Sequence, residues 1–386
     1  MRIVDVSPVV VGAEMRNWIF VKVTTDEGVV GWGEATTEWR TRSVVGALED
    51  FAELVVGQDP FRIEFIWQSL YRQQFWKGGV ISMSALSGID QALHDIKAQA
   101  LGVPIYELLG GRVRDTFRLY DHLGGGRPDS VYGAVDPEAF RDAALASRAE
   151  GYTALKILAV PVSGPLAAGQ DLRLAEAAIS AVRDAVGDDH EIMVDLHGRT
   201  TPAAAIAFAR ALEPSRPWFL EEPCPPEDEG QLAQIAAHTN VALATGERLY
   251  GRSEFLRVLQ TRAVGVIQPD ICHAGGPSEL RRIAALGETF GIGVAPHNPA
   301  GPIATLHNLH FAAATPNWMI QEQMRNAAPW FDEILTSPIR IQDGQALLPE
   351  GPGLGSAVNE TVAAAHPYQP EKQIRAILAD GSVADW

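Results

Sequence analysis

The sequence predicts an α/β fold in which a barrel of parallel strands and helices follows a smaller α+β domain. Three observations predict it. Residues 1–114 read as antiparallel strands followed by a block of helices, residues 115–340 alternate short apolar runs with alanine-rich helices, and acidic and histidine residues recur at regular intervals in that second part. The first pattern is typical of α+β domains, and the second is typical of parallel βα units, eight of which can close a barrel.

The first domain is predicted to start as an antiparallel meander. β-Branched residues alternate along Ile19–Thr25, Asp26–Gly28 supply a turn, and Val29–Glu34 reads as the return strand. Helical patterns follow, and the strongest of them is stopped by Gly102 and Pro104. The predicted helices are Val45–Val56, Phe61–Phe75 and Ser82–Leu101, the last with Ala85, Ile89, Leu93 and Ile96 near one face.

The second domain is predicted to contain eight strands separated by helices. The strands are Phe117–Leu123, Ala154–Leu158, Glu191–Leu196, Trp218–Glu221, Ala242–Gly246, Gly265–Pro269, Gly291–Pro296 and Trp318–Gln321. The helices include Asp171–Val186, Ala203–Leu212, Ser278–Phe290 and Ile303–Ala314. The segment after about Ile341 is rich in glycine and proline, so we expect it to pack back on the first domain rather than form another barrel unit.

Composition narrows the possible partners and the compartment. The formal net charge of −17, from 48 acidic against 31 basic residues, repels phosphate backbones, so no nucleic-acid partner is expected. Two cysteines, Cys224 and Cys272, are too few for a disulfide framework. The sequence shows no signal peptide and no apolar run long enough to span a bilayer, so we expect a cytoplasmic protein without a membrane partner.

Six polar residues recur at the predicted carboxyl ends of successive barrel strands. Asp195, Glu221, Glu247, Asp270, His297 and Glu322 follow one another at intervals of 26, 26, 23, 27 and 25 residues. Any one of the acids could simply cap a helix. Six in regular phase instead predict an active site, because the strand ends meet at one rim of a barrel.

Three of these carboxylates predict a metal site. Asp195, Glu221 and Glu247 come from adjacent strands, and three crowded anions are costly unless a cation lies among them. Ligands that are all oxygen favour a hard ion, so we expect Mg²⁺, with Mn²⁺ as an alternative. Zinc is disfavoured because the cysteines follow the acids in sequence rather than replacing them.

The remaining polar residues predict proton transfer. Asp270 beside His297 would raise the basicity of the imidazole and fix its tautomer, which makes a general base. His197 lies across the barrel and could act as an acid, although it could also be a solvated loop histidine. Glu322 could hydrogen-bond a developing enolate oxygen if it is protonated. A metal, a base and an acid suit the removal of a proton next to a carboxylate and the expulsion of a β-hydroxyl as water.

Several motifs carry a resemblance to a known family over nearly the whole chain. They are Val194–Arg199, Leu220–Pro223, Gly246–Arg248, Gln268–Asp270, His273–Gly276, Ala295–His297, Gly57–Pro60 and Gln321–Gln323. With these motifs the chain resembles the mandelate racemase subgroup of the enolase superfamily. Within that subgroup it is most similar to D-galactonate dehydratase and related sugar-acid dehydratases.

The resemblance implies a fold, a metal and a set of roles. The fold is a modified TIM barrel, (β/α)₇β, at residues 115–340, with a cap at residues 1–114 completed by residues 341–386. Asp195, Glu221 and Glu247 would bind Mg²⁺, His297 would be the base tuned by Asp270, His197 the acid, and Glu322 the group that stabilises the intermediate. Cap loops around Trp39–Arg40 and Trp76–Gly79 would close over a sugar acid, with Trp76, Lys77, Lys156 and Arg248 as substrate-binding residues. A homo-oligomer is expected.

Departures from the family pattern leave the substrate open. Many superfamily members carry Lys-x-Lys where this chain has Lys156–Leu158, so a racemase that uses the second lysine is disfavoured. Lys156 itself could neutralise the substrate carboxylate or be a solvated surface lysine. Leu158 and the pair Asp121–His122 differ from galactonate dehydratases, so D-gluconate, D-mannonate and pentonates remain possible substrates. A racemase or epimerase of a 2-hydroxy acid, and a non-catalytic relative that binds an acid sugar, are the alternative functions.

Overall fold

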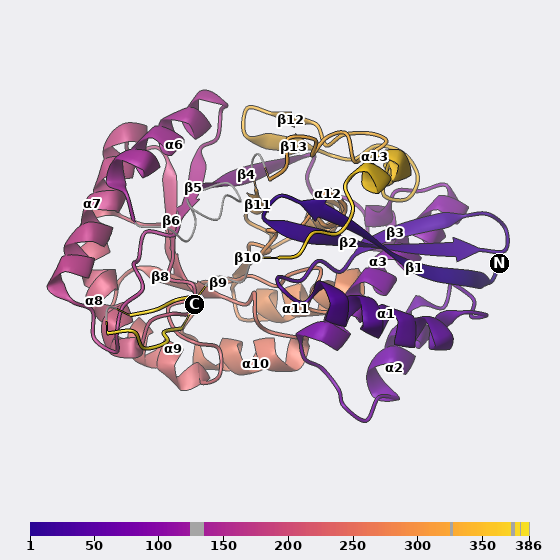
Figure 1. Cartoon of the computed structure of the whole chain (residues 1–386), viewed down its shortest axis with the longest axis horizontal. Coiled ribbons are helices and arrows are strands. Elements are labelled where there is room, and N and C mark those ends of the chain that lie inside the picture. The colour runs from indigo at the N-terminus through magenta and orange to yellow at the C-terminus, as the bar shows by residue number, and fades with distance from the viewer. Residues whose placement is uncertain (124–134, 325–326, 372–374, 379, 386) are drawn as a thin grey trace.

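A computed structural model describes the chain except for residues 124–134, 325–326, 372–374, 379 and 386. A small antiparallel sheet with its helices packs beside a larger set of parallel strands covered by helices (Figure 1). The α/β class and the barrel with its α+β cap, which the sequence predicts, are therefore confirmed.

The cap begins with the antiparallel meander β1 (Ile3–Ala13), β2 (Arg16–Thr25) and β3 (Val30–Glu34). Helices α1 (Thr41–Val55), α2 (Ile63–Arg72), α3 (Val80–Leu101) and α4 (Ile105–Leu108) follow. The prediction of one apolar face on α3 is too narrow, because most of its side chains from Met83 to Ala98 are buried. Helix α3 lies between the cap sheet and helix α11 (Gly276–Thr289) of the barrel, which cover it from both sides.

The barrel strands run parallel in sequence order, and each of the eight predicted strands is present. They are β4 (Thr116–Leu123), β5 (Ala154–Ile157), β6 (Glu191–Asp195), β7 (Phe219–Glu221), β8 (Ala242–Thr245), β9 (Val266–Ile267), β10 (Gly293–Val294) and β11 (Gln321–Gln323). Strand β11 pairs with β4, and the Met319 amide donates to the Val294 carbonyl at 2.8 Å, which closes the barrel. The last strand begins three residues later than predicted.

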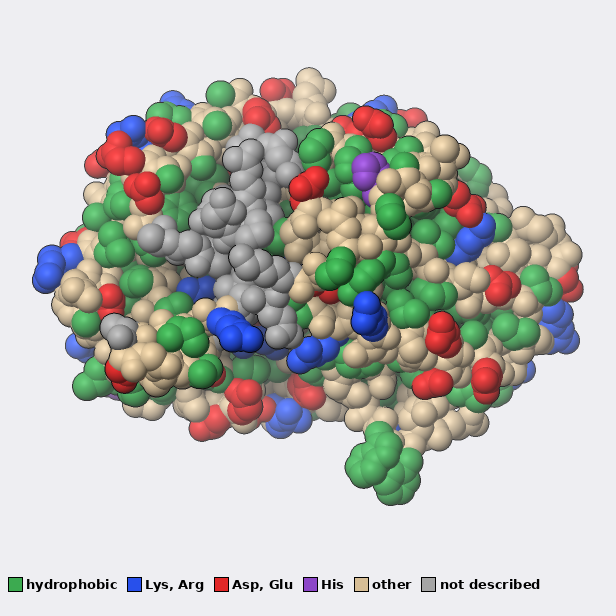
Figure 2. All heavy atoms as spheres, viewed as in Figure 1, with side chains coloured by type: hydrophobic (Ala, Val, Ile, Leu, Met, Phe, Trp, Pro, Cys, Tyr) green, Lys and Arg blue, Asp and Glu red, His purple; other side chains and the backbone are tan. Residues whose placement is uncertain are grey.

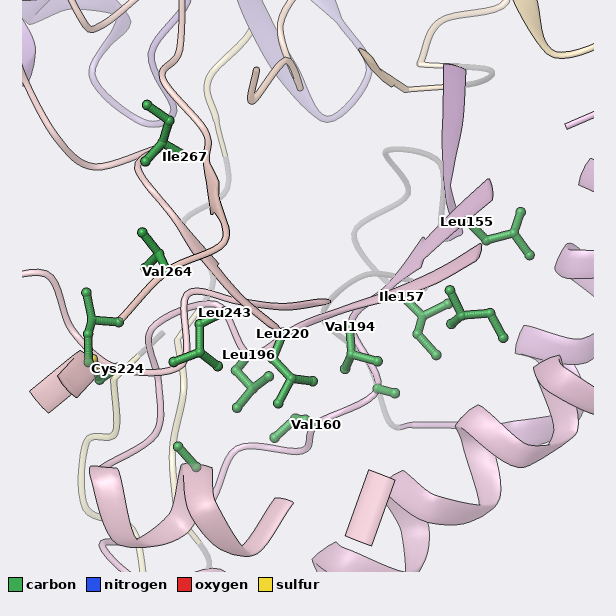
Figure 3. Close-up of a cluster of buried hydrophobic side chains, with 14 of the residues drawn as sticks. Leu155, Ile157, Val160, Val194, Leu196, Leu220, Cys224, Leu243, Val264 and Ile267 are labelled. Atoms are coloured by element: carbon green, nitrogen blue, oxygen red, sulfur yellow. The ribbon is translucent and has the colours of Figure 1, made fainter. Parts of the chain in front are cut away.

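Helices cover the outside of the barrel (Figure 1). In addition to α11 they are α6 (Pro137–Ala149), α7 (Gly169–Val186), α8 (Pro202–Leu212), α9 (Glu229–Ala236), α10 (Arg252–Thr261) and α12 (Pro302–Ala314). Outward-facing strand residues pack with these helices in one buried cluster, part of which Figure 3 shows, including Leu155, Val194, Leu220 and Leu243. Apolar burial of this kind is the main favourable term in folding.

A separate ring of apolar side chains fills the barrel interior. Each strand, or the residue next to it, contributes one member: Tyr120, Ala154, Met193, Phe219, Ala244, Val266, Ala295 and Ile320. Because side chains alternate along a strand, the residue two positions further on points into the same interior. This ring therefore forms the floor under the carboxyl ends of the strands.

The C-terminal segment packs on the barrel as well as on the first domain. The hairpin β12 (Ile341–Gln342) and β13 (Gln345–Leu347) pairs antiparallel with β4 of the barrel. Beyond it, the Ile105 amide of the cap donates to the Gly353 carbonyl at 3.0 Å, and the Gly12 amide donates to the His366 carbonyl at 2.9 Å. Helix α13 (Glu360–Ala365) precedes His366.

Acidic and basic side chains are interspersed over the face of the molecule that Figure 2 shows, without a large area of one sign. In the described part of the chain, no helix combines the length and the apolar composition that crossing a membrane requires.

Candidate active site

The polar residues at the carboxyl ends of the strands form a second ring above the apolar floor. Most follow a floor residue by two positions, which places them on the inward face. They are His122, Lys156, Asp195, Glu221, Gln268, His297 and Glu322, whereas Glu247 follows Gly246 at the end of β8. Five of the seven sequence-predicted metal and proton-transfer positions thus belong, with Lys156, to one layer or its edge, and a cavity of about 510 Å³ opens above it.

Asp195, Glu221 and Glu247 come together as the sequence predicts. One carboxylate oxygen from each lies within 4.8 Å of the others, and Asp195 is in register with Glu221 on the neighbouring strand. Burial raises the pKa of Glu221 well above its ordinary range, although Lys156 opposes this, and burial raises the pKa of Glu247 to about 7. Crowded, buried carboxylates of this kind fit a divalent cation, which would stabilise their charged forms.

Lys156 is buried among these acids, so the alternative of a solvated surface lysine is wrong. Its Nζ lies 2.5 Å from a Glu221 oxygen, 2.7 Å from a Glu322 oxygen and 4.0 Å from an Asp195 oxygen. Burial alone would lower the pKa of Lys156, but the neighbouring carboxylates raise it well above its ordinary value. The ammonium therefore stays charged and balances part of the negative charge of the site.

His297 and Asp270 form the predicted pair. The Nδ1 atom of His297 lies 2.7 Å from Asp270, and its Nε2 atom lies 3.7 Å from a Glu247 oxygen. Burial would lower the pKa of His297, but Glu247, Asp270 and Glu322 raise it to about 10. The pKa of Asp270 is lowered, because His273 and His297 outweigh the effect of burial. Asp270 thus stays ionised and can orient and charge the imidazole.

His197 lines the same cavity from the opposite side of the barrel. It follows β6, which is four strands from β10, and the Asp195 side chain accepts a hydrogen bond from its amide at 2.6 Å. The backbone of His197 has a positive φ of 56°, an uncommon conformation that turns the side chain out of the strand direction. Burial, together with Arg199 and Arg248, lowers the pKa of His197 well below its ordinary value, so its imidazole is neutral near pH 7.

Glu322 could donate to an enolate oxygen only if it were protonated, and its surroundings favour the charged form. It accepts a hydrogen bond from the Asn298 amide at 2.7 Å and pairs with Lys156. Burial would raise the pKa of Glu322, but chiefly Lys156 and then His297 lower it to about 2. Glu322 is therefore a carboxylate here, and it supports Lys156 rather than offering a proton.

The cavity wall includes part of the predicted substrate-binding set. Cap residues Arg16, Thr37, Glu38, Trp39 and Arg40 lie above the barrel residues Leu158, His197 and Arg248. Two Arg248 nitrogens also donate to one Glu222 oxygen, at 2.6 and 2.9 Å. Trp39 and Arg40 thus reach the position expected of a cap loop.

Trp76 and Lys77 do not reach this cavity. Trp76 is 84% exposed, and both residues border a separate, very small hollow beside α2 and α3. Gly78 and Gly79, just before α3 begins, both have positive φ values of 76°, a conformation that glycine adopts readily. Of this segment only Val80 lines the site.

Two further residues belong to the site and were not singled out from the sequence. Gln268 donates from Nε2 to Glu221 at 2.7 Å and so orients a metal ligand. His122, noted only as a difference from related enzymes, lines the cavity at the end of β4. The signal that could have found both is their position two residues after an apolar, inward-facing strand residue.

Comparisons with known proteins agree with this architecture. Residues 5–110 match the mandelate racemase / muconate lactonizing enzyme N-terminal domain, and residues 139–362 match the enolase C-terminal domain-like family. The chain belongs to the enolase superfamily. Two proteins named D-galactonate dehydratase, from Ralstonia pickettii (strain 12J) and Ralstonia nicotianae, are 39% and 40% identical over 377 residues, which is 96% of this chain and of each relative.

Solved structures of the superfamily superpose closely. A member of the enolase superfamily from Salmonella Typhimurium is 34% identical with a TM-score of 0.89, covering 95% of this chain and 98% of that chain. A mandelate racemase/muconate lactonizing enzyme from Jannaschia sp. CCS1 is 32% identical with a TM-score of 0.89, covering 96% and 98%.

Proposed function

We propose that this protein is a Mg²⁺-dependent dehydratase that converts an aldonic acid into a 2-keto-3-deoxy acid. The observation that carries the proposal is one cavity in which an Asp270–His297 pair faces a cluster of three carboxylates, with a second histidine on the opposite wall. That arrangement provides a base, an acid and a site for a hard cation, which are the groups that dehydration next to a carboxylate needs.

The chain's own groups divide the reaction between two sides of the barrel. His297 removes the proton from the carbon next to the carboxylate, and Asp270 holds the imidazole and stabilises its charge. Because Glu247 contributes most to raising the His297 pKa to about 10, neutralising Glu247 with a cation would lower that pKa and leave the imidazole free to accept the proton. His197 gives a proton to the hydroxyl that leaves from the next carbon, and water departs. The resulting enol becomes the 2-keto-3-deoxy acid. His197 is neutral in the free enzyme, so the bound anionic substrate must raise the pKa of His197 until the imidazole carries the proton that it donates.

Asp195, Glu221 and Glu247 would hold the cation, with Gln268 orienting Glu221. When bound, a divalent cation supplies positive charge at the substrate carboxylate, which lowers the cost of the extra negative charge that deprotonation creates. The raised pKa values of Glu221 and Glu247 support this assignment, because burial disfavours their charged forms and a cation would stabilise them. Mn²⁺ could replace Mg²⁺ at such a site.

D-Galactonate is the first substrate to test, because it is the acid in the names of the similar dehydratases. D-Gluconate, D-mannonate and pentonates are the next, because Leu158 and His122 line the cavity. We also propose that the enzyme works in the cytoplasm as a homo-oligomer, without nucleic-acid or membrane partners. The division into a cap of residues 1–114 plus 341–386 and a barrel of residues 115–340 belongs to the same proposal.

The decisive experiment measures two quantities in deuterated buffer with Mg²⁺ present: the amount of keto acid formed and the exchange of the substrate's α-proton with solvent. Wild-type enzyme is expected to form a keto acid from at least one aldonate. His297→Asn should abolish both keto-acid formation and the exchange of the α-proton with solvent. His197→Asn should retain α-proton exchange but lose dehydration, because only the acid is missing.

Two outcomes would contradict the proposal. Deuterium in recovered, epimerised acid without water loss would identify an epimerase, for which the two opposed histidines are also suited. Binding of acids without exchange or turnover by the wild type would identify a non-catalytic relative.

A further inference from the structure

His122 occupies a position on the inner wall of the site that the proposed reaction leaves without a role. It lies at the end of β4, two residues after Tyr120 of the apolar floor, and lines the main cavity. In the strand order, β4 lies between β11, which carries Glu322, and β5, which carries Lys156; His122 is in register with Lys156. Strand β4 is four strands from β8, which Glu247 follows, so His122 faces the metal-ligand side across the cavity.

One polar atom of this imidazole has no partner. His122 is only 7% exposed, and its Nδ1 atom, buried from solvent, makes no hydrogen bond with any residue that the structure describes. Buried polar atoms in folded proteins are nearly always satisfied, because losing water without gaining a partner costs free energy. A histidine of this kind in a cavity wall is suited to a ligand as its partner.

The surroundings of His122 limit which ligand group it can bind. Burial, followed by the positive charge of Lys156, lowers the pKa of His122 to about 4, so the ring is neutral near pH 7. A neutral imidazole has one donor and one acceptor nitrogen, and a hydroxyl likewise both donates and accepts. A carboxylate of the ligand would instead bind best to a positively charged group, which the neutral His122 ring is not.

Lys156 and Glu322 flank His122 in its own layer and pair with each other, whereas the wall one level above them is apolar. Leu158 follows β5 on one side of His122, Met324 follows β11 on the other, and both line the cavity. Apart from the paired Lys156 and Glu322, the described residues of this part of the wall therefore offer one neutral polar group beside two apolar ones. A ligand hydroxyl in the correct position gains a partner there, whereas a hydroxyl placed elsewhere along the wall would lose its water against an apolar side chain.

We propose that His122 is a specificity-determining residue that hydrogen-bonds one hydroxyl of the sugar-acid chain, on the side of the cavity opposite Glu247. The proposal rests on the proposed function and specifies it further. His122 would then determine which acid binds best among acids that differ in the configuration or presence of a single hydroxyl.

The test is a cycle that pairs His122 variants with substrates lacking one hydroxyl. With the best acid, His122→Leu should raise KM by about 10- to 100-fold and change kcat little, because binding rather than chemistry is affected. Removing the hydroxyl that His122 contacts should cost the wild type a similar factor in kcat/KM and should cost His122→Leu almost nothing. Asn and Gln both carry an amide that can donate and accept hydrogen bonds, at two different distances from the backbone. Either His122→Asn or His122→Gln should therefore restore most of the affinity.

Controls separate this role from others. His238→Leu, on the exposed surface, should leave KM unchanged, and a thermal melt of each variant excludes simple unfolding. The proposal is overturned if every deoxy substrate is penalised equally in wild type and His122→Leu, or if kcat falls while KM stays constant, which would indicate proton transfer.

A different result separates this proposal from the proposed function. If the wild type turns over no acid, the dehydratase assignment fails, and His122 is tested by the binding of the same acids measured by calorimetry. Equal affinities of wild type and His122→Leu for all acids that bind would then overturn the specificity role, whereas a 10- to 100-fold loss would support it.

Discussion

At the scale of single residues, we expect the charge of Lys156 to stabilise the buried carboxylates of the site when no cation is bound. Lys156→Met would leave Glu221 and Glu322 buried without their ammonium partner. Breaking a buried ion pair from one side typically costs about 3–5 kcal/mol. We expect a loss of this size in the free energy of unfolding with a chelator present, and a larger rise of the variant's melting temperature than of the wild type's when Mg²⁺ is added.

A surface ion pair provides the matched control. Lys22 pairs with the exposed Glu360, so Lys22→Met should cost at most about 1 kcal/mol and respond to Mg²⁺ as the wild type does. Equal behaviour of the two lysine variants in calorimetry would contradict the role given to Lys156.

Asp270 gives a second prediction at this scale. Asp270→Asn removes the negative charge 2.7 Å from the His297 ring while keeping a side chain of similar size. The expected result is a fall of about 10²- to 10⁴-fold in the rate of α-proton exchange, which is the usual contribution of a positioned base. Exchange is measured by NMR in deuterated buffer, and the exposed Asp188→Asn serves as control. An unchanged exchange rate would show that His297 needs no carboxylate partner.

The same residues show which parts of the site the sequence can predict. Asp195, Glu221, Glu247, Asp270, His297 and Glu322 could be predicted because their spacing repeats the length of a βα unit, and a barrel brings such positions together. Lys156 could be placed on its strand, but its partners depend on which strands face it once the barrel closes. Trp76 and Lys77 could not be placed, because periodicity does not specify the path of a loop.

At the scale of elements, the cap depends on a close contact between β3 and α3. A Cβ added to Gly33 would lie 2.0 Å from the Gly88 carbonyl oxygen of α3, and one added to Gly31 would lie 2.2 Å from the Ala92 carbonyl oxygen. Backbone atoms cannot move aside as a side-chain tip can. Gly33→Ala should therefore separate the strand from the helix and lower the free energy of unfolding by at least about 2 kcal/mol, measured by urea denaturation.

Gly46 in α1 is the matched control for that substitution. A Cβ there meets no atom within 4 Å, so Gly46→Ala should be neutral or stabilising by up to about 1 kcal/mol. If both variants were equally stable, the close contact would not limit the packing of the cap. The strands and helices themselves could be predicted from periodicity. The contact between the backbones of β3 and α3 could not, because glycines are its only sign in the sequence and glycines also occur for other reasons.

At the scale of the whole molecule, buried carboxylates connect the cap to the rest of the fold. Glu34 of β3 accepts hydrogen bonds from the Gly301 and Ala304 amides at the start of α12, at 2.6 and 2.8 Å. Asp95 of α3 accepts from the Trp32 amide at 2.9 Å and from the Leu354 amide of the C-terminal segment at 2.8 Å. These contacts join parts of the chain that are far apart in sequence, so their protonation affects the assembly of the two domains.

The stability of the protein should consequently fall as pH rises through neutrality. Burial raises the pKa of Glu34 from 4.5 to about 7 and that of Asp95 from 3.8 to about 6, outweighing the hydrogen bonds that favour the charged forms. A carboxyl whose pKa is raised by folding contributes stability that is complete below its unfolded pKa and is lost as pH rises through its folded pKa. For Glu34 the contribution amounts to about 3 kcal/mol. Urea denaturation between pH 5 and pH 8 should therefore show the wild type losing stability relative to Glu34→Gln, whose side chain cannot ionise. If the free energies of unfolding of the two proteins changed in parallel with pH, Glu34 would already be charged at pH 5.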